Sequence, residues 1–262
     1  MTTTRGSRGD ATRTMELLWG LAPRPTRGPK QGLTLEAVVD AAVALADAEG
    51  IDALSMRRVA EALGVGAMSL YTYVRGKAEL VDLMLDRVYG EQLAGIASEG
   101  GWRARLESRA RADWALYERH PWVVRAAGPR PTLGPHETAV YEATLAAVDG
   151  IGLTGDEMVA VVTLVAGYVG GVARGIVEAV SEGETQEPEE AWWRARSAVL
   201  ERAGAFDPDR FPVSTRLGAE GVFDGSPDEP DYLAGEIRRT FAFGLQRVLD
   251  GIAVLVDARA TG

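Results

Sequence analysis

The sequence contains no cysteine, which excludes disulfide bonds and metal sites built from thiolates. A reducing compartment is the simplest setting for such a chain, and we therefore expect a cytoplasmic protein. Only two histidines are present, and the sequence does not group them with carboxylates into a cluster of metal ligands. We therefore expect no bound metal and no cofactor.

Long hydrophobic runs are also missing. The longest stretch without a charged residue has 16 residues, from Met158 to Ala173, whereas a helix needs roughly 20 apolar residues to cross a bilayer. The first residues of the chain contain arginines but lack the apolar segment of a secretory signal. We expect a buried helix at 158–173 and no association with a membrane.

The sequence lacks the motifs of common enzyme classes and the alternating pattern of strands. It contains no HExxH zinc motif, no Walker phosphate-binding loop and no nucleophile elbow. Apolar residues recur at helical spacing throughout, and no segment alternates apolar and polar residues over the length of a strand. We therefore predict an all-α fold and no enzymatic activity, and an all-α enzyme is kept only as an alternative.

Positive charge is scarce in the chain as a whole, because the formal net charge is −10. The acidic excess is uneven: residues 1–90 hold 11 basic and 11 acidic side chains, whereas residues 91–262 hold 17 basic and 27 acidic ones. Affinity for phosphate depends on local cations and not on the charge of the whole chain. The N-terminal part therefore remains compatible with binding to nucleic acid.

Residues 1–31 are rich in Thr, Arg, Gly and Pro, which predicts a flexible basic arm. Two interpretations stay open for this arm. It is either a disordered tail, or a segment that follows the DNA backbone or enters the minor groove through Arg24, Arg27 and Lys30. A short apolar segment from Met15 to Leu21 interrupts it, and its position is not predicted.

A helix-turn-helix pattern lies between Leu54 and Lys77. A first short helix can begin after Ser55, whose hydroxyl can cap it, and can end at Gly64 in the left-handed conformation. A second helix is predicted from Gly66 to Val74. Apolar residues at helical spacing define the inner faces of the two helices: Val59, Ala60, Leu63, Leu70 and Val74.

The second predicted helix leaves small and hydroxyl-bearing side chains facing outward, among them Met68, Ser69, Thr72 and Tyr73. A short helix with such a surface can enter the major groove, where hydroxyl and methyl groups meet the edges of bases. The same pattern also suits a helical hairpin inside a core, and that alternative stays open for this stretch alone.

The flanking segments extend the pattern. Upstream, the residues LTLEAVVDAA open an amphipathic helix that Thr34 can cap, and downstream LYTYVRGKAELVDLM leads directly into a longer helix. Together these segments, at about residues 33–90, resemble the tetracycline-repressor (TetR/AcrR) family of bacterial transcriptional regulators. The resemblance implies a helix-turn-helix DNA-binding domain at 32–78 and a helical effector-binding and dimerisation domain at 79–262.

The resemblance also implies which side chains contact DNA. By their position in the motif these are Arg57, Ala67, Met68, Ser69, Tyr71, Thr72, Tyr73 and Lys77. An arginine at position 57 can donate two hydrogen bonds to a guanine or pair with a phosphate. The tyrosines and Lys77 are expected to hold phosphates. One tyrosine could instead belong to the core, and we expect Tyr73 to be the exposed one.

Beyond residue 90 further helices are predicted, and the HPWV segment at 120–123 resembles the ligand-binding domain of the tetracycline-repressor branch. An effector pocket there should be apolar and aromatic with a few polar groups. The candidates, each of which could also be ordinary core, are Trp114, Tyr117, His120, Trp122, Tyr141, Tyr168 and Phe241. The imidazole of His120 could serve a metal or a polar ligand.

Two long helices, at about 156–181 and 232–258, are candidates for a dimer interface, and internal core is their alternative role. In the first of them Gly167, Gly171 and Gly175 would let another helix approach closely. A dimer can place two recognition helices about 34–36 Å apart, on the two half-sites of a palindrome. We therefore predict a homodimeric repressor that binds double-stranded DNA at a palindromic operator.

A small, largely apolar or aromatic effector is predicted to release this repressor from its operator. Activation in place of repression stays open from the sequence, as does a helical ligand-binding protein without DNA function.

Overall fold

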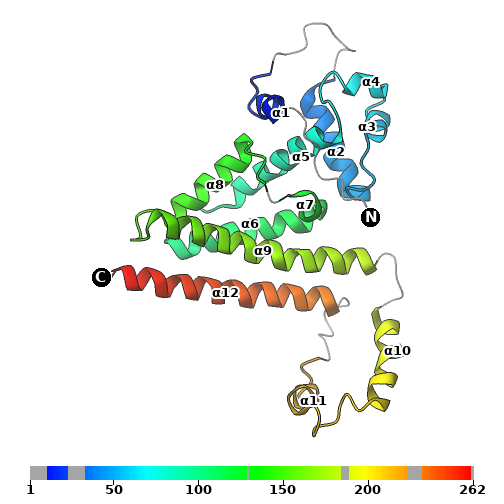
Figure 1. Cartoon of the computed structure of the whole chain (residues 1–262), viewed down its shortest axis with the longest axis vertical. Helices are drawn as coiled ribbons and strands as arrows, with labels where there is room; N and C mark the ends of the chain where they lie inside the picture. Colours follow the sequence, from blue (N-terminus) through cyan, green and yellow to red (C-terminus); the bar gives the residue numbers. More distant parts are fainter. Residues whose placement is uncertain (1–10, 23–32, 129, 184–188, 224–231, 261–262) are drawn as a thin grey trace. The chain divides into compact units, whose positions relative to one another are not determined.

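The computed structural model describes residues 11–22, 33–128, 130–183, 189–223 and 232–260, and all regular structure within these ranges is helical (Figure 1). This confirms the predicted all-α fold. The chain divides into two compact units, residues 1–173 with 247–262 and residues 174–246. The helix-turn-helix pattern and the helices after it share the first unit, so the predicted domain boundary at residue 78 does not separate the units and stays a prediction.

The first unit begins with α1 (Ala11–Leu18), α2 (Leu35–Glu49), α3 (Met56–Ala62) and α4 (Ala67–Leu70). The side-chain oxygens of Thr34 and Ser55 cap α2 and α3, each accepting from the backbone N–H three residues further on, at 3.1 and 3.3 Å. Gly64 follows α3 with a φ of 65°, the left-handed conformation that ends the helix. Local chemistry thus places these helix ends where the sequence predicts them.

The helix α1 occupies part of the segment that we expected to be a flexible arm. Its Leu17 and Leu18 pack against the buried core, and the guanidinium of Arg13 lies 3.6 Å from the carboxylate of Glu79. The apolar side chains of this segment explain the difference, because a helix can bury them against the bundle. The residues predicted to follow DNA from the arm lie outside the described ranges: Arg24, Arg27 and Lys30.

The first unit continues with α5 (Lys77–Gln92), the 3₁₀ turn η1 (Leu93–Gly95), α6 (Trp102–Arg119), α7 (Trp122–Ala126) and α8 (Pro135–Val148). The helix α5 packs on α2, α6 and α8. One buried cluster extends from the helix-turn-helix into the later helices and includes Val59, Leu70, Leu80, Leu116 and Trp122. The helix-turn-helix therefore shares a core with α5, α6 and α7.

A buried carboxylate on α5 holds the start of α8. Asp86 accepts hydrogen bonds from the backbone N–H groups of His136 and Glu137, at 3.1 and 3.0 Å, and from His136 Nδ1 at 2.9 Å. Gly134 comes so close that a Cβ there would lie 2.2 Å from Asp86 Oδ1. The first turn of α8 is thereby capped by α5, an arrangement that also suits the positive end of the helix dipole.

Two long helices, α9 (Gly155–Gly183) and α12 (Tyr232–Ala260), take part in both units. Thr154 and Glu157 form a capping box at the start of α9, with hydrogen bonds of 2.9 and 3.3 Å. In the first unit Arg259 Nε donates to Glu157 at 3.2 Å, so the start of α9 lies beside the end of α12. In the second unit a Cβ on Gly175 would lie 3.7 Å from Ile237.

The helix α9 is buried on one side only. Val161, Val165 and Val169 are buried, whereas Val159 and Leu164 are 47% and 51% exposed. By length and composition Gly155–Glu178 could cross a membrane, but one such helix is weak evidence, since core helices of soluble proteins have the same properties. The predicted buried helix at 158–173 is therefore correct for one face and wrong for the other.

Candidate DNA interface and effector region

The second helix of the helix-turn-helix is shorter than predicted. The helix α4 makes one turn, Ala67–Leu70, whereas the sequence suggested a helix from Gly66 to Val74. Beyond it the chain tightens into a turn, in which the N–H groups of Tyr73 and Val74 both donate to the carbonyl of Leu70, at 2.9 and 3.0 Å. Leu70 and Val74 are fully buried, as predicted, so α4 is anchored from its inner side.

Three of the side chains predicted to contact DNA are exposed around α4. Met68 is 78% exposed, and Tyr71 and Thr72 are also exposed. Ala67 and Ser69 are half-buried. The exposed set offers a thioether chain, a phenol and a hydroxyl, which are groups suited to apolar contact with a thymine methyl and to hydrogen bonds with bases or phosphates.

The two tyrosines of this segment have opposite environments. Tyr73 is half-buried against the core, and its hydroxyl donates to the carbonyl of Leu33 at 2.8 Å, whereas Tyr71 is 44% exposed. The prediction that Tyr73 is the exposed tyrosine is therefore wrong. The cause is the shortness of α4: Tyr73 falls in the turn after the helix, where its ring is directed back to the start of α2.

The predicted basic contacts also differ from one another. Arg57 is exposed and lies 3.6 Å from Glu61, so its guanidinium is at the surface. Lys77, by contrast, donates from Nζ to the carbonyl of Ile51 at 2.9 Å, which ties the first turn of α5 to the turn after α2. Arg75, which we did not predict as a contact, is exposed beside α4. Its position directly before the Gly-Lys pair is the signal that could have identified it.

A polar junction around the buried His120 joins the helix-turn-helix to the later helices. His120, which is 4% exposed between α6 and α7, lies with Nδ1 2.7 Å from Asp47 of α2 and Nε2 3.2 Å from Glu91 of α5. Trp122 Nε1 donates to the same Asp47 oxygen at 2.7 Å. Arg119 donates to Glu91 at 2.6 Å. We call these five side chains the His120 junction.

The charges of the His120 junction depend on one another. A protonated imidazole can donate to both carboxylates, whereas a neutral ring can donate to only one of them. Partial burial would raise the pKa of Glu91, but hydrogen bonds from Arg119 and His120 outweigh this effect and lower it. His120 was predicted to offer its imidazole to a metal or ligand, and in the structure both ring nitrogens face carboxylates of this chain.

The other predicted effector residues are spread over both units. Trp114 and Trp122 are buried, Tyr117 and Tyr168 are half-buried, and Tyr141 is 44% exposed. Tyr117 lies against α9, with its hydroxyl 3.8 Å from where a Cβ on Gly170 would be. Phe241 is buried and belongs to the second unit. The structure thus does not gather all seven side chains into one site.

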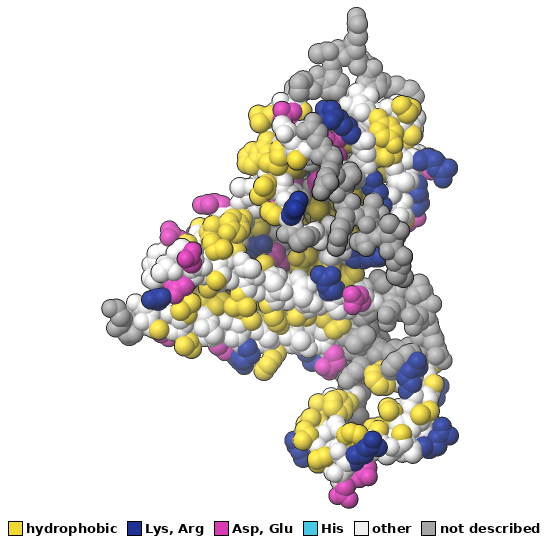
Figure 2. Space-filling view, viewed as in Figure 1, with side chains coloured by type: hydrophobic (Ala, Val, Ile, Leu, Met, Phe, Trp, Pro, Cys, Tyr) yellow, Lys and Arg dark blue, Asp and Glu magenta, His cyan; other side chains and the backbone are white. Residues whose placement is uncertain are grey.

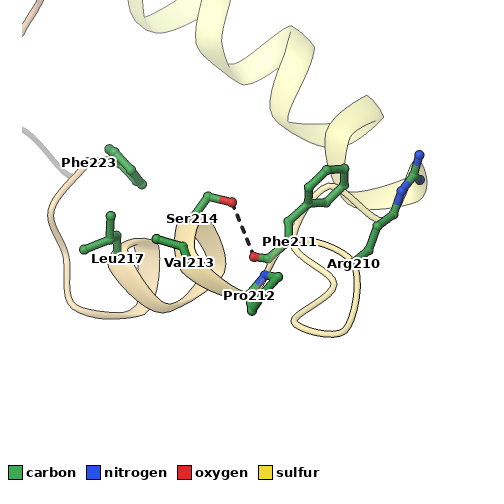
Figure 3. A pocket seen from close by; sticks show the side chains of 7 residues that line it. All are labelled: Arg210, Phe211, Pro212, Val213, Ser214, Leu217 and Phe223. Atoms are coloured by element: carbon green, nitrogen blue, oxygen red, sulfur yellow. Dashed lines mark hydrogen bonds between the residues drawn. The ribbon is translucent and has the colours of Figure 1, made fainter.

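A shallow apolar groove lies elsewhere, in the second unit, which contains α10 (Glu189–Arg202) and α11 (Pro212–Ala219). None of the predicted effector residues lines it. The lining side chains surround the start of α11 (Figure 3): Arg210, Phe211, Pro212, Val213, Ser214, Leu217 and Phe223. Within the described ranges no three His, Cys, Asp or Glu side chains lie close enough together to hold a metal ion.

Two family models match the chain. Residues 38–84 match the model described as bacterial regulatory proteins, tetR family, and residues 95–256 match the tetracyclin repressor-like C-terminal domain. The first match runs from α2 to the middle of α5, and the second spans α6 to most of α12. Together they cover both the helix-turn-helix and the bundle that carries the predicted effector residues.

Similar proteins extend these matches over nearly the whole chain. The HTH-type transcriptional repressor DrrR1 of Streptomyces coeruleorubidus is 47% identical over 261 residues, which is 98% of this chain and 91% of DrrR1. The crystal structure of apo ActR from Streptomyces coelicolor has a TM-score of 0.67 at 25% identity, covering 88% of this chain and 99% of ActR. A second ActR structure, in complex with actinorhodin, has a TM-score of 0.64 at 25% identity, covering 85% and 96%.

Proposed function

This chain belongs to the TetR family of bacterial transcriptional regulators, and we propose that it acts as a homodimeric repressor that binds a palindromic operator and leaves it when a small aromatic effector binds. The family is not enzymatic, and a relative that matches almost the full length is a repressor. We place the DNA-binding domain at 32–78 and the effector-binding and dimerisation domain at 79–262. The start of α5 then marks the boundary between them.

The observation that carries the proposal is the exposed surface of α4 on a fully buried scaffold. Leu70 and Val74 hold the segment from within, while Met68, Tyr71 and Thr72 face outward. Such a helix can enter the major groove without any rearrangement of its own core. Arg57 and Arg75, exposed on either side of α4 in the sequence, are in a position to add contacts with phosphates.

The exposed faces of α9 and α12 support dimerisation. In the first unit, Val159 and Leu164 on α9 and Val254 on α12 are each 47% exposed or more. Hydrophobic side chains are visible along these helices in the space-filling view (Figure 2). Exposed apolar surface of this kind marks sites of association between chains. A cyclic dimer would bury the same face of both copies.

Small residues would let the two copies approach closely on α9. Around Gly167 and Gly171, apart from the neighbouring residues and the backbone of α9 itself, no described atom lies within 4 Å of where a Cβ would be. Gly175, the third glycine of this repeat, instead faces Ile237 of the same chain. The first two glycines are therefore available to a partner helix, whereas the third contributes to packing within one chain.

Release by an effector requires a connection between the bundle and the DNA-binding helices. The His120 junction supplies one, because it contacts α2 through Asp47 and α5 through Glu91. An effector that binds better when α6 and α7 are displaced would shift this contact, and with it the position of α4. The effector changes operator affinity only by the ratio of its affinities for the two states.

Selection of bound duplexes from a random DNA pool tests the operator proposal. We expect a palindromic sequence with half-sites about one helical turn apart, since two copies of α4 must contact one face of the duplex. A selected site without two-fold symmetry would refute dimeric recognition. Failure of any duplex to bind even at low salt would instead favour a helical ligand-binding protein.

Actinorhodin is the first effector to test, because ActR has been crystallised with it and shares this fold. We expect it, or a similar aromatic molecule that binds the chain, to weaken binding to the selected operator by about fivefold or more. The measurement is the retardation of labelled operator across a titration of the compound. Unchanged operator affinity for every molecule that binds the chain would remove the effector from the proposal.

A further inference from the structure

A cluster of polar side chains lies between α5 and α6, at Gln92, the last residue of α5. Gln92, which is 4% exposed, donates from Nε2 to Asp113 Oδ1 at 2.7 Å. Asp113 is equally buried and forms an ion pair with Arg109, one turn earlier on α6. Arg105 lies one further turn back on the same face. We call these four side chains the Gln92 cluster.

Besides Arg109 Nη1, which forms the ion pair with Asp113, three buried atoms of the Gln92 cluster have no hydrogen-bond partner among the described residues. They are the acceptor Oε1 of Gln92 and the two donors Nε of Arg109 and Nε of Arg105. Buried polar atoms in native proteins are almost always paired, because an unpaired one lowers stability. Three of them within two turns of one helix face and its neighbour therefore require an explanation.

Aromatic residues flank the Gln92 cluster on both helices. Trp114 and Tyr117 follow Asp113 on α6, and Tyr89 lies one turn before Gln92 on α5. Burial raises the pKa of Tyr89, the charges of Tyr117, Glu137 and Asp113 raise it further, and Arg109 opposes them. Burial likewise raises the pKa of Asp113, which Arg109 and Gln92 partly oppose. Perturbed groups of this kind concentrate at functional sites.

The unpaired atoms define the chemistry of a ligand. Two arginine N–H groups call for an oxygen acceptor, and a charged acceptor forms the stronger bonds with a guanidinium. The amide oxygen of Gln92 calls for a hydroxyl or N–H donor. The aromatic neighbours add apolar contact area.

We propose that the Gln92 cluster is the polar end of the effector site and that it selects an aromatic ligand with a carboxylate or similar anionic oxygen and a separate hydroxyl. The anionic oxygen pairs with Arg109 and Arg105, and the hydroxyl donates to Gln92 Oε1. This inference rests on the proposed effector-responsive function and specifies the chemistry of its ligand. None of the four side chains was among the residues predicted from the sequence.

Gentisate, a benzene ring with a carboxylate and hydroxyl groups, is a suitable probe for calorimetric titration of the full chain. Methyl gentisate lacks the negative charge, and benzoate lacks the hydroxyls. We expect gentisate to bind at least about tenfold more tightly than either of them, since each comparison removes one charged or polar pair. Absence of gentisate binding, or equal affinity for gentisate and methyl gentisate, would overturn the proposal.

Matched variants locate the ligand. Arg109→Gln should lower the affinity for gentisate by about tenfold or more and change the affinity for methyl gentisate by less than about twofold. Arg111→Gln is the control, because Arg111 is exposed on the same helix and pairs with Glu107 at 2.7 Å. An equal effect of the two variants would place the ligand elsewhere. Melting temperature and operator binding verify that each variant is folded.

Further variants keep the test decisive if Arg109→Gln does not fold. Arg105→Gln removes the guanidinium that would donate to the anionic oxygen. Gln92→Glu keeps the shape of the side chain but adds a negative charge that repels an anion. Both variants should lower the affinity for gentisate more than the affinity for methyl gentisate, and equal changes in the two affinities would refute the assignment. If none of these variants changes the affinity for gentisate while actinorhodin still releases the operator, the Gln92 cluster is not part of the effector site and the proposed function stands. Failure to bind any operator would refute the function itself.

Discussion

At the scale of single residues, Tyr71 and Tyr73 have the same side chain in different environments. Tyr73 donates to the carbonyl of Leu33 at 2.8 Å and packs on the core, so it fastens the turn after α4 to the start of α2. Tyr71 is 44% exposed beside α4. Tyr73 therefore contributes to the stability of the fold, and we propose that Tyr71 contacts DNA.

Tyr73→Phe removes one part-buried hydrogen bond and keeps the ring. We expect the free energy of unfolding to fall by about 1 kcal/mol, because the carbonyl of Leu33 loses its partner. Denaturation in urea, followed by circular dichroism, measures this change.

Tyr71→Phe is the matched comparison, since the same atom is removed from an exposed ring. Its stability should stay within about 0.5 kcal/mol of the parent, while its affinity for the selected operator falls severalfold through loss of a phosphate contact. An equal loss of stability in both variants would contradict the division of tasks between the tyrosines.

At the scale of helices, the start of α9 is held by an acid that stays charged at low pH. The hydrogen bond from Arg259 is the main cause that lowers the pKa of Glu157 to about 2, and the backbone N–H of Thr154 is the second. Because the pKa of this acid is lowered on folding, its contribution to stability is complete above its ordinary value of 4.5 and is lost as the pH falls toward 2.

Glu157→Gln should therefore melt at a lower temperature than the parent between about pH 5 and pH 8, by a difference that does not change across this window. The difference should shrink as the pH falls from about 4.5 toward 2, where the parent loses the same charge. Melting curves across this range measure it. A difference that grows in acid would show that the Glu157 pair with Arg259 is not what the substitution removes.

The His120 junction links helices that are distant in sequence, and it leads to a prediction about signalling. Asp47→Asn keeps an oxygen that can accept from Trp122 but removes the charge that faces His120. We expect the effector to change operator affinity about three- to tenfold less than in the parent, because α2 is less firmly coupled to α6 and α7.

Asp40→Asn is the control for this variant, since Asp40 lies on the same helix and forms an exposed pair with Arg87 at 3.0 Å. Its response to the effector should equal that of the parent. Operator retardation with and without a releasing compound measures both variants, and an undiminished response in Asp47→Asn would remove the junction from the path of signalling.

The sequence predicts helix ends well because their chemistry is local. Thr34, Ser55 and Thr154 each cap a helix through a bond to a residue three positions away, and Gly64 needs only its own φ. These features require no knowledge of the rest of the fold. The predicted all-α class follows from the same local periodicity.

Contacts between distant segments could not be predicted in this way. Asp47 lies 73 residues from His120, and Lys77 lies 26 residues from the carbonyl that it binds. The pairing of Gln92 with Asp113 likewise depends on how α5 and α6 pack. Periodicity assigns a side chain to a face, but its partner on the neighbouring helix is set by the tertiary structure.

At the scale of the whole molecule, the exposed face of α9 predicts that the dimer is needed for function. Leu164→Glu places a charge on this face, where Leu164 is 51% exposed in the single chain. We expect the variant to shift toward monomer in light scattering after size-exclusion chromatography. Its operator affinity should fall roughly 100-fold or more, because two linked recognition helices bind far better than one.

Val213→Glu serves as the control, since Val213 is 62% exposed on α11 in the other unit. It should remain dimeric and bind the operator as the parent does. A Leu164→Glu chain that stays dimeric, or a Val213→Glu chain that becomes monomeric, would move the interface away from α9.

The single turn of α4 has a consequence for how a target is found in a genome. Four helical residues contact few bases, so one half-site is a short sequence that occurs often by chance in a genome. In the proposed dimer, selectivity then comes from the spacing between the two half-sites, which the distance between the two copies of α4 sets. Inserting about five base pairs at the centre of the operator turns one half-site to the opposite side of the duplex. That insertion should harm binding more than any single base change within a half-site.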